Sequence, residues 1–443
     1  MKKSVLKRYS SSGGVHVPHN KNTAGLETKT MPLPSFVTIP MQMHIGAPCK
    51  PLVAVGDTVK VGQKIGESEQ FVSAPIHASV SGKVTAIKEV MLGGGNYAEA
   101  VIIESDGEMT PAELTPPKVD TAEEFAQAVR ECGLVGLGGA GFPTHIKLRI
   151  PEGKKIDTLL INAAECEPYL TSDNREILEN TWDVMSGIYA VKQILQIPRV
   201  VIGVEKNKPH AIEVLTNISR SSADKDDGVE VLTLPASYPQ GAEKVLIRSA
   251  TGREVPPGKL PADVGCLVLN VTSAAVLARY LKTGMPLVEK RVTVDGSAIS
   301  SPCNVIVPIG TSVADILSFV GLKEEASKIL LGGPMMGTSL SDVNVPVVKN
   351  TNGIIAMNEK EASLCEPTAC IRCGRCVNAC PMRLMPLMLE RAVARRDTDA
   401  MQKYDLTVCM ECGCCVYVCP AKRPLVQSMR LGKALLRDSA KKK

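Results

Sequence analysis

Ten of the fifteen cysteines in this 443-residue chain fall between Cys365 and Cys419, and eight of them form one pattern that occurs twice. The two copies are Cys370-x2-Cys373-x2-Cys376-x3-Cys380-Pro381 and Cys409-x2-Cys412-x2-Cys415-x3-Cys419-Pro420. Three thiols separated by two residues each can surround one inorganic group, whereas the fourth, held beside a proline, points away from it. The spacing therefore predicts that this segment folds around metal–sulfur sites.

The duplicated run resembles that of bacterial two-cluster ferredoxins. The resemblance implies one 4Fe-4S cluster on Cys370, Cys373, Cys376 and Cys419, and a second on Cys409, Cys412, Cys415 and Cys380. Zinc is disfavoured, because zinc sites usually pair two C-x2-C knuckles. Cys365 and Cys414 stand outside the pattern and are predicted not to be ligands. Residues 381–408 carry apolar side chains at helical spacing, which favours an α-helical two-cluster module.

The rest of the chain is long enough for further domains, since 443 residues predict about three. The most apolar run, Val264 to Ala278, is too short to span a membrane. The N-terminus is basic but has no apolar stretch behind it, so we expect a cytoplasmic protein. A net charge of +5 and few aromatic residues argue against nucleic acid. Residues 421–443 hold eight basic residues and one acidic residue, which favours either an acidic partner or a solubilising tail.

A glycine-rich segment, residues 133–144 (GLVGLGGAGFPT), contains G-x-G-x-x-G at Gly136, Gly138 and Gly141. A dinucleotide-binding fingerprint needs a strand before it, but Thr121 to Cys132 is predicted to be a helix with Thr121 as its N-cap. We therefore expect no simple Rossmann site. The glycines would instead let the backbone approach a phosphate or a flavin ring.

Strands and helices alternate through residues 156–234. Strands are predicted at 156–161, 200–204 and 229–234, and helices at 175–195 and 208–219. This alternation is typical of a parallel α/β domain. The first strand ends in the acidic loop 162–168 (NAAECEP), and ligands of open α/β sheets bind at the carboxyl ends of strands.

In this order, GLGGAGFPTHIKL, NAAECEP, YPQGAE and LNVTS resemble the flavin and NADH site of the NADH-binding subunit of respiratory complex I. With the cysteine module behind them, nearly the whole chain resembles the RnfC family of the Rnf electron transport complex, an ion-translocating NAD:ferredoxin oxidoreductase. The resemblance implies non-covalent FMN, NAD(H) and two 4Fe-4S clusters as cofactors. The matching positions are Gly136, Gly138, Gly139, Phe142, Lys147, Asn162, Glu165, Glu167, Tyr238, Gly241, Glu243, Asn270 and Ser273.

Among those positions, Phe142, Lys147 and Glu167 match residues that meet the nicotinamide nucleotide. The chain departs from the complex I pattern at four positions, which bear on nucleotide affinity more than on flavin binding: Leu137, Ala164, Cys166 and Ala242. No side chain is expected to act as an acid or base in hydride transfer.

Two further modules flank this region. Residues 37–103 resemble a lipoyl or biotinyl carrier, a barrel-sandwich hybrid, but residues 67–71 at the expected hairpin tip lack the carrier lysine, so a structural role is predicted. Residues 286–337 resemble a soluble-ligand-binding β-grasp module. The expected organisation is multidomain α/β and α+β: an extension at 1–35, the barrel-sandwich hybrid at 36–105, the FMN/NADH α/β domain at 106–285, the β-grasp at 286–345, the cluster domain at 346–430 and a basic tail at 431–443.

The resemblance implies an enzyme subunit that exchanges hydride with NAD(H) through FMN and passes single electrons along two clusters. A flavin is needed because hydride carries two electrons and each cluster accepts one. The expected partners are the other membrane and cluster-bearing subunits of the complex, with ferredoxin as an indirect partner, at the cytoplasmic side of the membrane. The alternatives are a flavin-free ferredoxin-like adaptor and a subunit of a sodium-pumping quinone reductase, although the latter should lack the cysteine runs.

Overall fold

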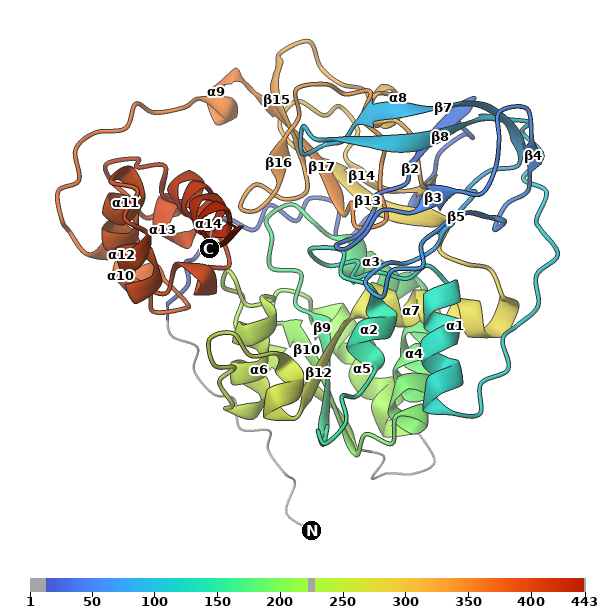
Figure 1. The fold of residues 1–443 in the computed structure, drawn as a ribbon, viewed down its shortest axis with the longest axis horizontal. Coiled ribbons are helices and arrows are strands. Elements are labelled where there is room, and N and C mark those ends of the chain that lie inside the picture. The colour runs from blue at the N-terminus through green and yellow to red at the C-terminus, as the bar shows by residue number, and fades with distance from the viewer. Residues whose placement is uncertain (1–12, 222–227, 442–443) are drawn as a thin grey trace.

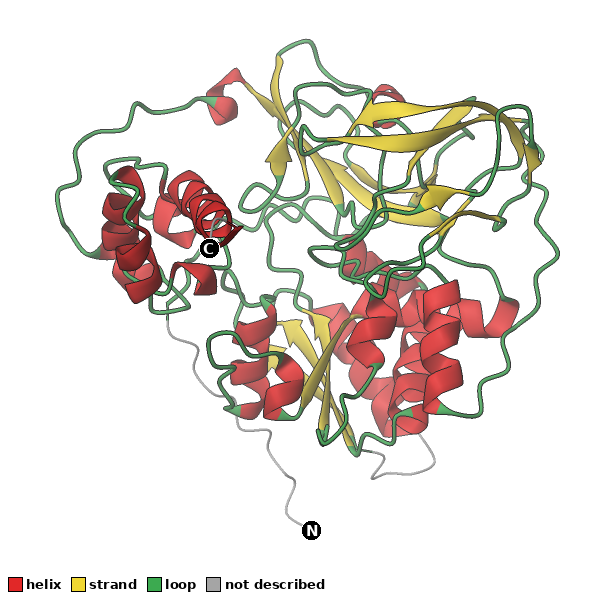
Figure 2. Ribbon diagram, in the orientation of Figure 1, coloured by secondary structure: helices red, strands yellow, loops and turns green. Residues whose placement is uncertain are grey.

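The computed structural model describes residues 13–221 and 228–441, which fold into four modules (Figure 1). Two β-rich modules lie at the top of Figure 2, an α/β module lies below them, and an all-helical module lies to one side. The predicted multidomain α/β and α+β fold class is confirmed. Within the described ranges, no helix combines the length and apolar character needed to cross a bilayer.

The first module is a sandwich of two small antiparallel sheets, ordered β2-β8-β7-β4 and β3-β5-β6. Its strands are β2 (Phe36–Pro40), β3 (Lys50–Pro51), β4 (Thr58–Val59), β5 (Lys64–Glu67), β6 (Ile76–His77), β7 (Gly82–Met91) and β8 (Tyr97–Ser105). Val37 and Ile39 alternate with more exposed residues and are fully buried, as expected of a strand with one face on a core. The tip after β5 is docked onto helix α1 (Ala122–Glu131) by a 2.6 Å ion pair between Glu67 and Arg130.

The α/β module is built on a parallel sheet of order β11-β10-β9-β12. Its strands are β9 (Thr158–Ala163), β10 (Arg199–Glu205), β11 (Val229–Leu234) and β12 (Cys266–Asn270). Its helices after α1 are α2 (Thr144–Leu148), α3 (Ser172–Glu179), α4 (Thr181–Ile194), α5 (Pro209–Ser221), α6 (Glu243–Thr251) and α7 (Val271–Thr283), with a 3-10 turn at Pro261–Val264. Leu159 and Leu160 are both fully buried, because a separate apolar core covers each face of the sheet.

Helix α1 confirms the predicted N-cap, since the Thr121 hydroxyl accepts a hydrogen bond from Glu124 N–H in a capping box. The prediction of one helix over 175–195 is wrong. The structure has two helices, α3 and α4, which meet at Asn180, where the backbone leaves the helical region (φ −128°, ψ 39°). Asn and Thr are weak helix formers, and the Thr181 hydroxyl donates to the Ile177 carbonyl at 2.6 Å across this junction.

The β-grasp module contains a six-stranded sheet of order β1-β14-β13-β17-β15-β16. Its elements are β1 (Lys29–Thr30), β13 (Glu289–Asp295), β14 (Cys303–Pro308), β15 (Ala326–Leu331), β16 (Thr338–Ser339), β17 (Gly353–Asn358), α8 (Val313–Val320) and α9 (Glu359–Ala362). Helix α8 begins after its N-cap Ser312, whose side chain accepts from Asp315 N–H, and ends before its C-cap Gly321. Strand β17 lies between β13 and β15, so the sheet uses residues beyond the boundary expected at 345.

The C-terminal module is helical, as predicted, and stands apart from the sheets (Figures 1 and 2). Its elements are α10 (Arg375–Ala379), α11 (Pro386–Ala394), α12 (Thr398–Lys403), a 3-10 turn (Leu406–Val408), α13 (Cys414–Tyr417) and α14 (Leu425–Lys441). Its small core includes Leu389, Met401 and Met429, so these methionines fill space between helices. Most of the predicted basic tail continues α14, whereas Lys442 and Lys443 lie outside the described residues.

Candidate functional site

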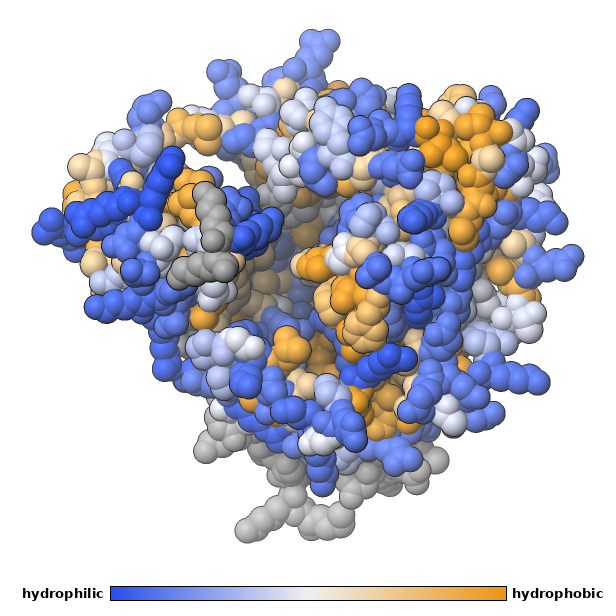
Figure 3. Space-filling model, in the orientation of Figure 1, coloured by the Kyte–Doolittle hydropathy of each residue, from blue (hydrophilic) through white to orange (hydrophobic). Residues whose placement is uncertain are grey.

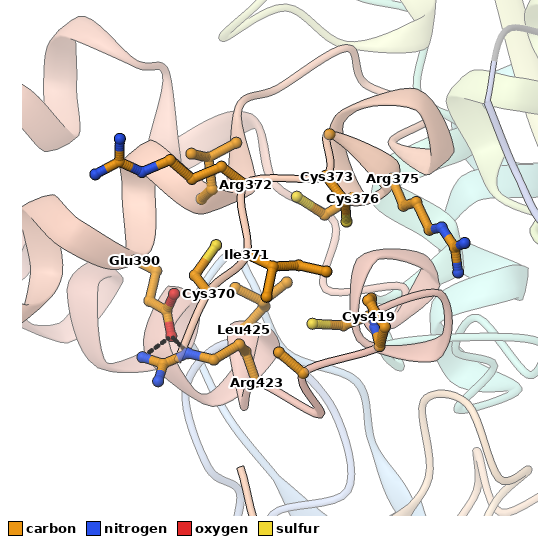
Figure 4. Close-up of a pocket in the computed structure, with 14 residues that line it drawn as sticks. Cys370, Ile371, Arg372, Cys373, Arg375, Cys376, Glu390, Cys419, Arg423 and Leu425 are labelled. Atoms are coloured by element: carbon orange, nitrogen blue, oxygen red, sulfur yellow. Dashed lines mark hydrogen bonds and ion pairs between the residues drawn. The ribbon is translucent and has the colours of Figure 1, made fainter. Parts of the chain in front are cut away.

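The eight patterned cysteines line two separate pockets in the helical module. Cys370, Cys373 and Cys376 of the first run share one pocket with Cys419 of the second run (Figure 4). Cys409, Cys412 and Cys415 share the other pocket with Cys380 of the first run. Each pocket therefore offers four thiols, three from one run and one from the other.

The turns of both runs depend on a glycine that precedes a short helix. Gly374 before α10 has φ +76°, and Gly413 before α13 has φ +79°. Glycine adopts this left-handed conformation without steric cost, so the chain can turn sharply between the second and third cysteines. None of the fifteen cysteines is in a disulfide. Among the described residues, no three His, Cys, Asp or Glu side chains converge closely enough to hold a single metal ion.

The two pockets differ in their surroundings. Cys370 and Cys373 are exposed, and the pocket they line also includes Arg372, Arg375 and Arg423. Arg423 is neutralised by Glu390 at 2.7 Å, as the dashed contact in Figure 4 indicates. We call this the outer pocket.

The second pocket faces the other modules, and we call it the inner pocket. Its Cys412 is buried in an apolar cluster that also contains Val15, Tyr238 and Cys414. A Cβ on Gly413 would lie 3.1 Å from the Met335 carbonyl oxygen, so the second cysteine run packs against the β-grasp module. Figure 3 shows that the molecule is hollowed between the helical module and the rest of the body on the face in view.

The two cysteines outside the pattern line neither pocket. Cys365 is exposed on the segment that leads to the first run. Cys414 is fully buried, and its thiol donates to the Tyr238 carbonyl. That these two residues are not ligands stays a prediction.

The glycine-rich loop connects helix α1 to helix α2, so the helix expected in front of it is confirmed. Gly136 N–H donates to the Phe142 carbonyl at 2.9 Å and closes the loop at its base. The start of the loop is fixed by the buried Lys349, whose ammonium donates to the Gly133 carbonyl at 2.7 Å and to the Pro75 carbonyl at 2.6 Å. The tip of the loop, residues 138–140, is exposed.

Two asparagines follow adjacent strands at the carboxyl edge of the parallel sheet. Asn162 in β9 and Asn270 in β12 are register partners. Asn162 donates to the Gly241 carbonyl at 2.8 Å. Asn270 is the N-cap of α7, because its side-chain oxygen accepts from Ser273 N–H at 3.2 Å. A Cβ on Gly138 would lie 2.6 Å from the Asn270 amide nitrogen, so the glycine loop passes directly over this edge.

The acidic loop after β9 is fixed to helix α3. The Glu165 carboxylate accepts hydrogen bonds from Asp173 N–H at 2.6 Å and from Asn174 N–H at 3.3 Å, in the first turn of the helix. Its burial raises the pKa of this carboxyl above its ordinary value, while the nearby Lys21 opposes the shift. Helix N-termini favour carboxylates, so Glu165 also acts as a remote cap.

Asp173 belongs to this edge, although it was not among the residues predicted from the sequence. Its carboxylate accepts from the Asn270 amide at 2.8 Å and from the Thr272 hydroxyl at 2.6 Å. It thereby fixes the start of α7. Its only sequence signal was an acidic residue in the first turn of a helix, which is common to many helices.

Glu167 and Tyr238 face the seam between modules rather than the glycine loop. One Glu167 oxygen accepts from Met335 N–H of the β-grasp module at 3.0 Å, while its other oxygen and the Tyr238 hydroxyl are buried and find no hydrogen-bond partner within residues 13–221 and 228–441. Burial raises the pKa of Glu167 to about 7. The role predicted for Glu167 at the nucleotide stays a prediction.

The remaining predicted residues lie near the strand edge. Lys147 of α2 and Glu243 of α6 form an ion pair of 3.0 Å between partly exposed side chains. Gly241 N–H donates to the Cys166 thiol at 3.3 Å, which ties the acidic loop to the segment before α6. Leu137, where the complex I pattern has arginine, is fully buried in the core.

The edge as a whole suits a flavin nucleotide. It combines an exposed glycine turn, two side-chain amides, the N-terminus of α7 and a lysine, which are the groups that hold phosphate and ring heteroatoms. A Cβ on Gly139 would meet no atom of the described residues within 4 Å, so within this part of the chain the loop has open space beside it.

Four family models match successive parts of the chain. They are an RnfC barrel-sandwich hybrid domain over residues 9–108, a Nuo51 FMN-binding domain over 129–279, an SLBB domain over 291–339 and a 4Fe-4S dicluster domain over 369–422. They bear out the four predicted module types and the predicted cofactors, FMN and 4Fe-4S clusters.

Curated relatives match over almost the full length. The chain is 45% identical, over 95% of its residues and 93% of the relative, to component C of a proton-translocating ferredoxin:NAD(+) oxidoreductase complex from Clostridium ljungdahlii. It is 43% identical, over 97% of both chains, to component C of the Na(+)-translocating complex from Acetobacterium woodii. This chain belongs to the RnfC family. Another RnfC relative, component C of an ion-translocating oxidoreductase complex from Rhodobacter capsulatus, is 40% identical over 99% of the chain.

A solved structure resembles this RnfC-type chain in fold. It is an NAD+-reducing [NiFe]-hydrogenase in its H2-reduced state, with a TM-score of 0.51, 17% identity and coverage of 71% of this chain and 63% of that chain. The family predicted from the sequence is therefore confirmed by the relatives, and its fold by the hydrogenase.

Proposed function

We propose that this chain is the subunit of an ion-translocating ferredoxin:NAD(+) oxidoreductase complex that exchanges electrons between NAD(H) and single-electron carriers. The observation that carries the proposal is the pair of pockets, each with four thiols drawn from both cysteine runs, in a module packed against a flavin-type strand edge. FMN supplies the exchange between two-electron and one-electron steps when it is bound.

The residues that would hold the flavin are those at the carboxyl edge of the parallel sheet. The exposed backbone of Gly138 and Gly139 can approach the ligand closely, and the Asn162 and Asn270 amides lie at the ends of neighbouring strands. Ser273, in the first turn of α7, adds a helix N-terminus that favours a phosphate. Lys147 can balance the charge of the phosphate. Its ion pair with Glu243 is partly exposed, so the ammonium is accessible to a ligand.

The cysteines that would hold the clusters are the two sets of four already described, with the inner set nearer to the flavin. The inner pocket packs against Tyr238 and Met335, whereas the outer pocket opens to solvent at Cys370 and Cys373. Electrons from the flavin would therefore reach the inner cluster first and leave the chain from the outer cluster.

No side chain is assigned as a general acid or base, because hydride exchange with a nicotinamide is the chemistry that a bound FMN would supply. The protein would bind the nicotinamide and flavin rings, exclude water from them and hold the two clusters close to each other. The partners would be the other subunits of the complex, which this chain would meet from the cytoplasmic side of the membrane.

The test is anaerobic purification followed by assays of iron, sulfide and flavin and by reduction with NADH. We expect about eight iron and eight sulfide per chain, one FMN released by acid, and bleaching of the flavin before the clusters. Cys365→Ala is the matched control and should leave all values unchanged. Clusters without flavin would favour the adaptor alternative, and zinc without sulfide would refute the proposal.

A further inference from the structure

The first described segment of the chain, residues 13–23, crosses the seam between the α/β module and the helical module. We call it the strap. Val15 pairs with Tyr238 through two backbone hydrogen bonds, of 2.8 and 2.9 Å. Gly14 N–H donates to the Ala379 carbonyl at 2.9 Å, beside the inner pocket. The strap thus contacts the α/β module at Tyr238 and the helical module at Ala379, although it precedes both modules in sequence.

Farther along the strap, Lys21 enters the acidic loop of the α/β module. Its ammonium donates to three backbone carbonyls, those of Glu165 at 2.8 Å, Glu167 at 2.8 Å and Leu170 at 2.5 Å. An ammonium has three protons, so this single group satisfies its whole donor capacity within one loop. The strap is further fixed there because Tyr169 N–H donates to the His19 carbonyl at 2.9 Å.

The loop needs such support because its backbone is strained. Glu165 and Tyr169 have φ values of +46° and +68°, in the left-handed region that residues with side chains rarely adopt. Such residues persist only where the surrounding structure holds them. The Lys21 bonds involve the carbonyls on both sides of this strained stretch, and they are charge-assisted, which makes them stronger than bonds between neutral groups.

A second lysine holds the same loop from within the α/β module. Lys208 donates to the Ala164 carbonyl at 2.6 Å and lies 3.4 Å from the Glu165 carbonyl. It also pairs with Glu205 at 3.6 Å, so its charge is balanced inside its own module. Lys21 differs from Lys208 because it belongs to the strap, which lies outside the α/β module in sequence.

We propose that Lys21 is a positioning residue of the flavin site, which holds the 165–170 loop in the conformation that aligns the strand edge with its ligand. The loop carries Glu165, which caps α3, and Cys166, which bonds to Gly241 beside Asn162. If the Lys21 ammonium is removed, the loop that contains the strained residues loses three hydrogen bonds, and the edge around Asn162 loses its fixed geometry. This proposal rests on the proposed function, because it takes FMN as the ligand of the edge.

The test measures FMN affinity in anaerobically purified full-length protein depleted of flavin, by quenching of FMN fluorescence. Lys21→Met keeps the length of the side chain and removes the ammonium, and we expect it to weaken FMN binding about tenfold or more. Lys21→Arg restores a cationic donor and should recover most of the affinity. Lys29→Met, an exposed lysine on β1, is the matched control and should bind FMN like the wild type.

Two further measurements separate positioning from general damage. Iron and sulfide should remain at the wild-type level in Lys21→Met, and amide hydrogen exchange should rise in residues 164–171 but not in strand β11. Wild-type FMN affinity in Lys21→Met would overturn the proposal, as would an equal loss in Lys29→Met.

If Lys21→Met does not accumulate as folded protein, Lys21→Gln, which keeps a neutral donor, takes its place. A reduced affinity in that variant supports the role of Lys21, and wild-type affinity refutes it. If the wild type itself binds no FMN while iron and sulfide are complete, the proposed function fails, and the role of Lys21 at a flavin site fails with it.

Discussion

The Cys414 thiol donates a hydrogen bond to the Tyr238 carbonyl oxygen across a sulfur–oxygen distance of 3.8 Å. Cys414 lies between two patterned cysteines in sequence, yet it does not line their pocket, and its thiol lies between the Cys412 thiol and the Tyr238 carbonyl of the α/β module. The apolar cluster around it joins the strap, the segment before α6 and the second cysteine run. This thiol therefore belongs to an interface between modules.

We accordingly expect Cys414→Ala to keep both clusters, with about eight iron per chain, whereas Cys415→Ala should lose about four. The two substitutions are at adjacent positions of α13, so each should disturb this helix to a similar extent. The cluster content of the two variants is measured by iron and sulfide assays on anaerobically purified protein and by electron paramagnetic resonance of the reduced clusters. Loss of a cluster in Cys414→Ala would contradict the interface role.

The crossed pairing of the two cysteine runs predicts different results for two double variants. Cys373→Ala with Cys419→Ala removes two thiols from the outer pocket alone, so about four iron should remain. Cys373→Ala with Cys380→Ala removes one thiol from each pocket and should weaken both clusters. If ligation followed the sequence runs instead, the second pair would spare one cluster and the first pair would damage both.

Gly138 and Gly139 should respond differently to substitution. A side chain at Gly138 would collide with the Asn270 amide, so Gly138→Val should lose FMN and lower the thermal stability of the protein. A Cβ at Gly139 meets no protein atom within 4 Å, so Gly139→Ala should keep the stability of the flavin-depleted protein. Flavin content and melting temperature are the measurements. Full flavin occupancy in Gly138→Val would exclude this loop from the flavin site.

Glu167 should make stability depend on pH. Burial raises its pKa from the ordinary 4.5 to about 7, so the folded chain binds more protons than the unfolded chain between these values. The contribution of this group to the free energy of unfolding is therefore fully present below about pH 4.5. It is lost as the pH rises through 7, which lowers the free energy of unfolding by about 3 kcal/mol. Glu167→Gln should remove that part of the fall. The test compares the melting temperatures of the wild type and of Glu167→Gln at pH 5.5 and 7.5 under anaerobic conditions. An identical pH dependence in the two proteins would contradict the raised pKa of Glu167.

The outer pocket should favour anionic electron acceptors. Arg372 and Arg375 line it, and within the described part of the chain neither forms an ion pair with a carboxylate. At low ionic strength, NADH-dependent reduction of ferricyanide should exceed that of cationic hexaammineruthenium, and changing both arginines to glutamate should lower the ratio several-fold. The same change in ratio in a Cys373→Ala, Cys419→Ala background would show that electrons leave elsewhere.

The cysteine sites could be predicted from sequence because each ligand run is local and its spacing is set by the geometry of the group it binds. Strands β9, β10 and β11 were also predictable, as continuous apolar runs such as residues 159–161, whereas β12 was not among the predicted strands. The break at Asn180 was not, because it depends on tertiary contacts of α3 that include Glu165 and Arg291. The orientation of Glu167 toward Met335 and the entry of Lys21 into the acidic loop join segments more than 140 positions apart, and no periodicity records such contacts.

The strap also bears on how the chain is made. Residues 13–23 are synthesised before the residues they contact, which include Tyr169, Tyr238 and Ala379. Contacts between such distant segments form slowly, because a long loop must close before any of them is gained. The strap can therefore complete its contacts only after the cluster module has been made and docked.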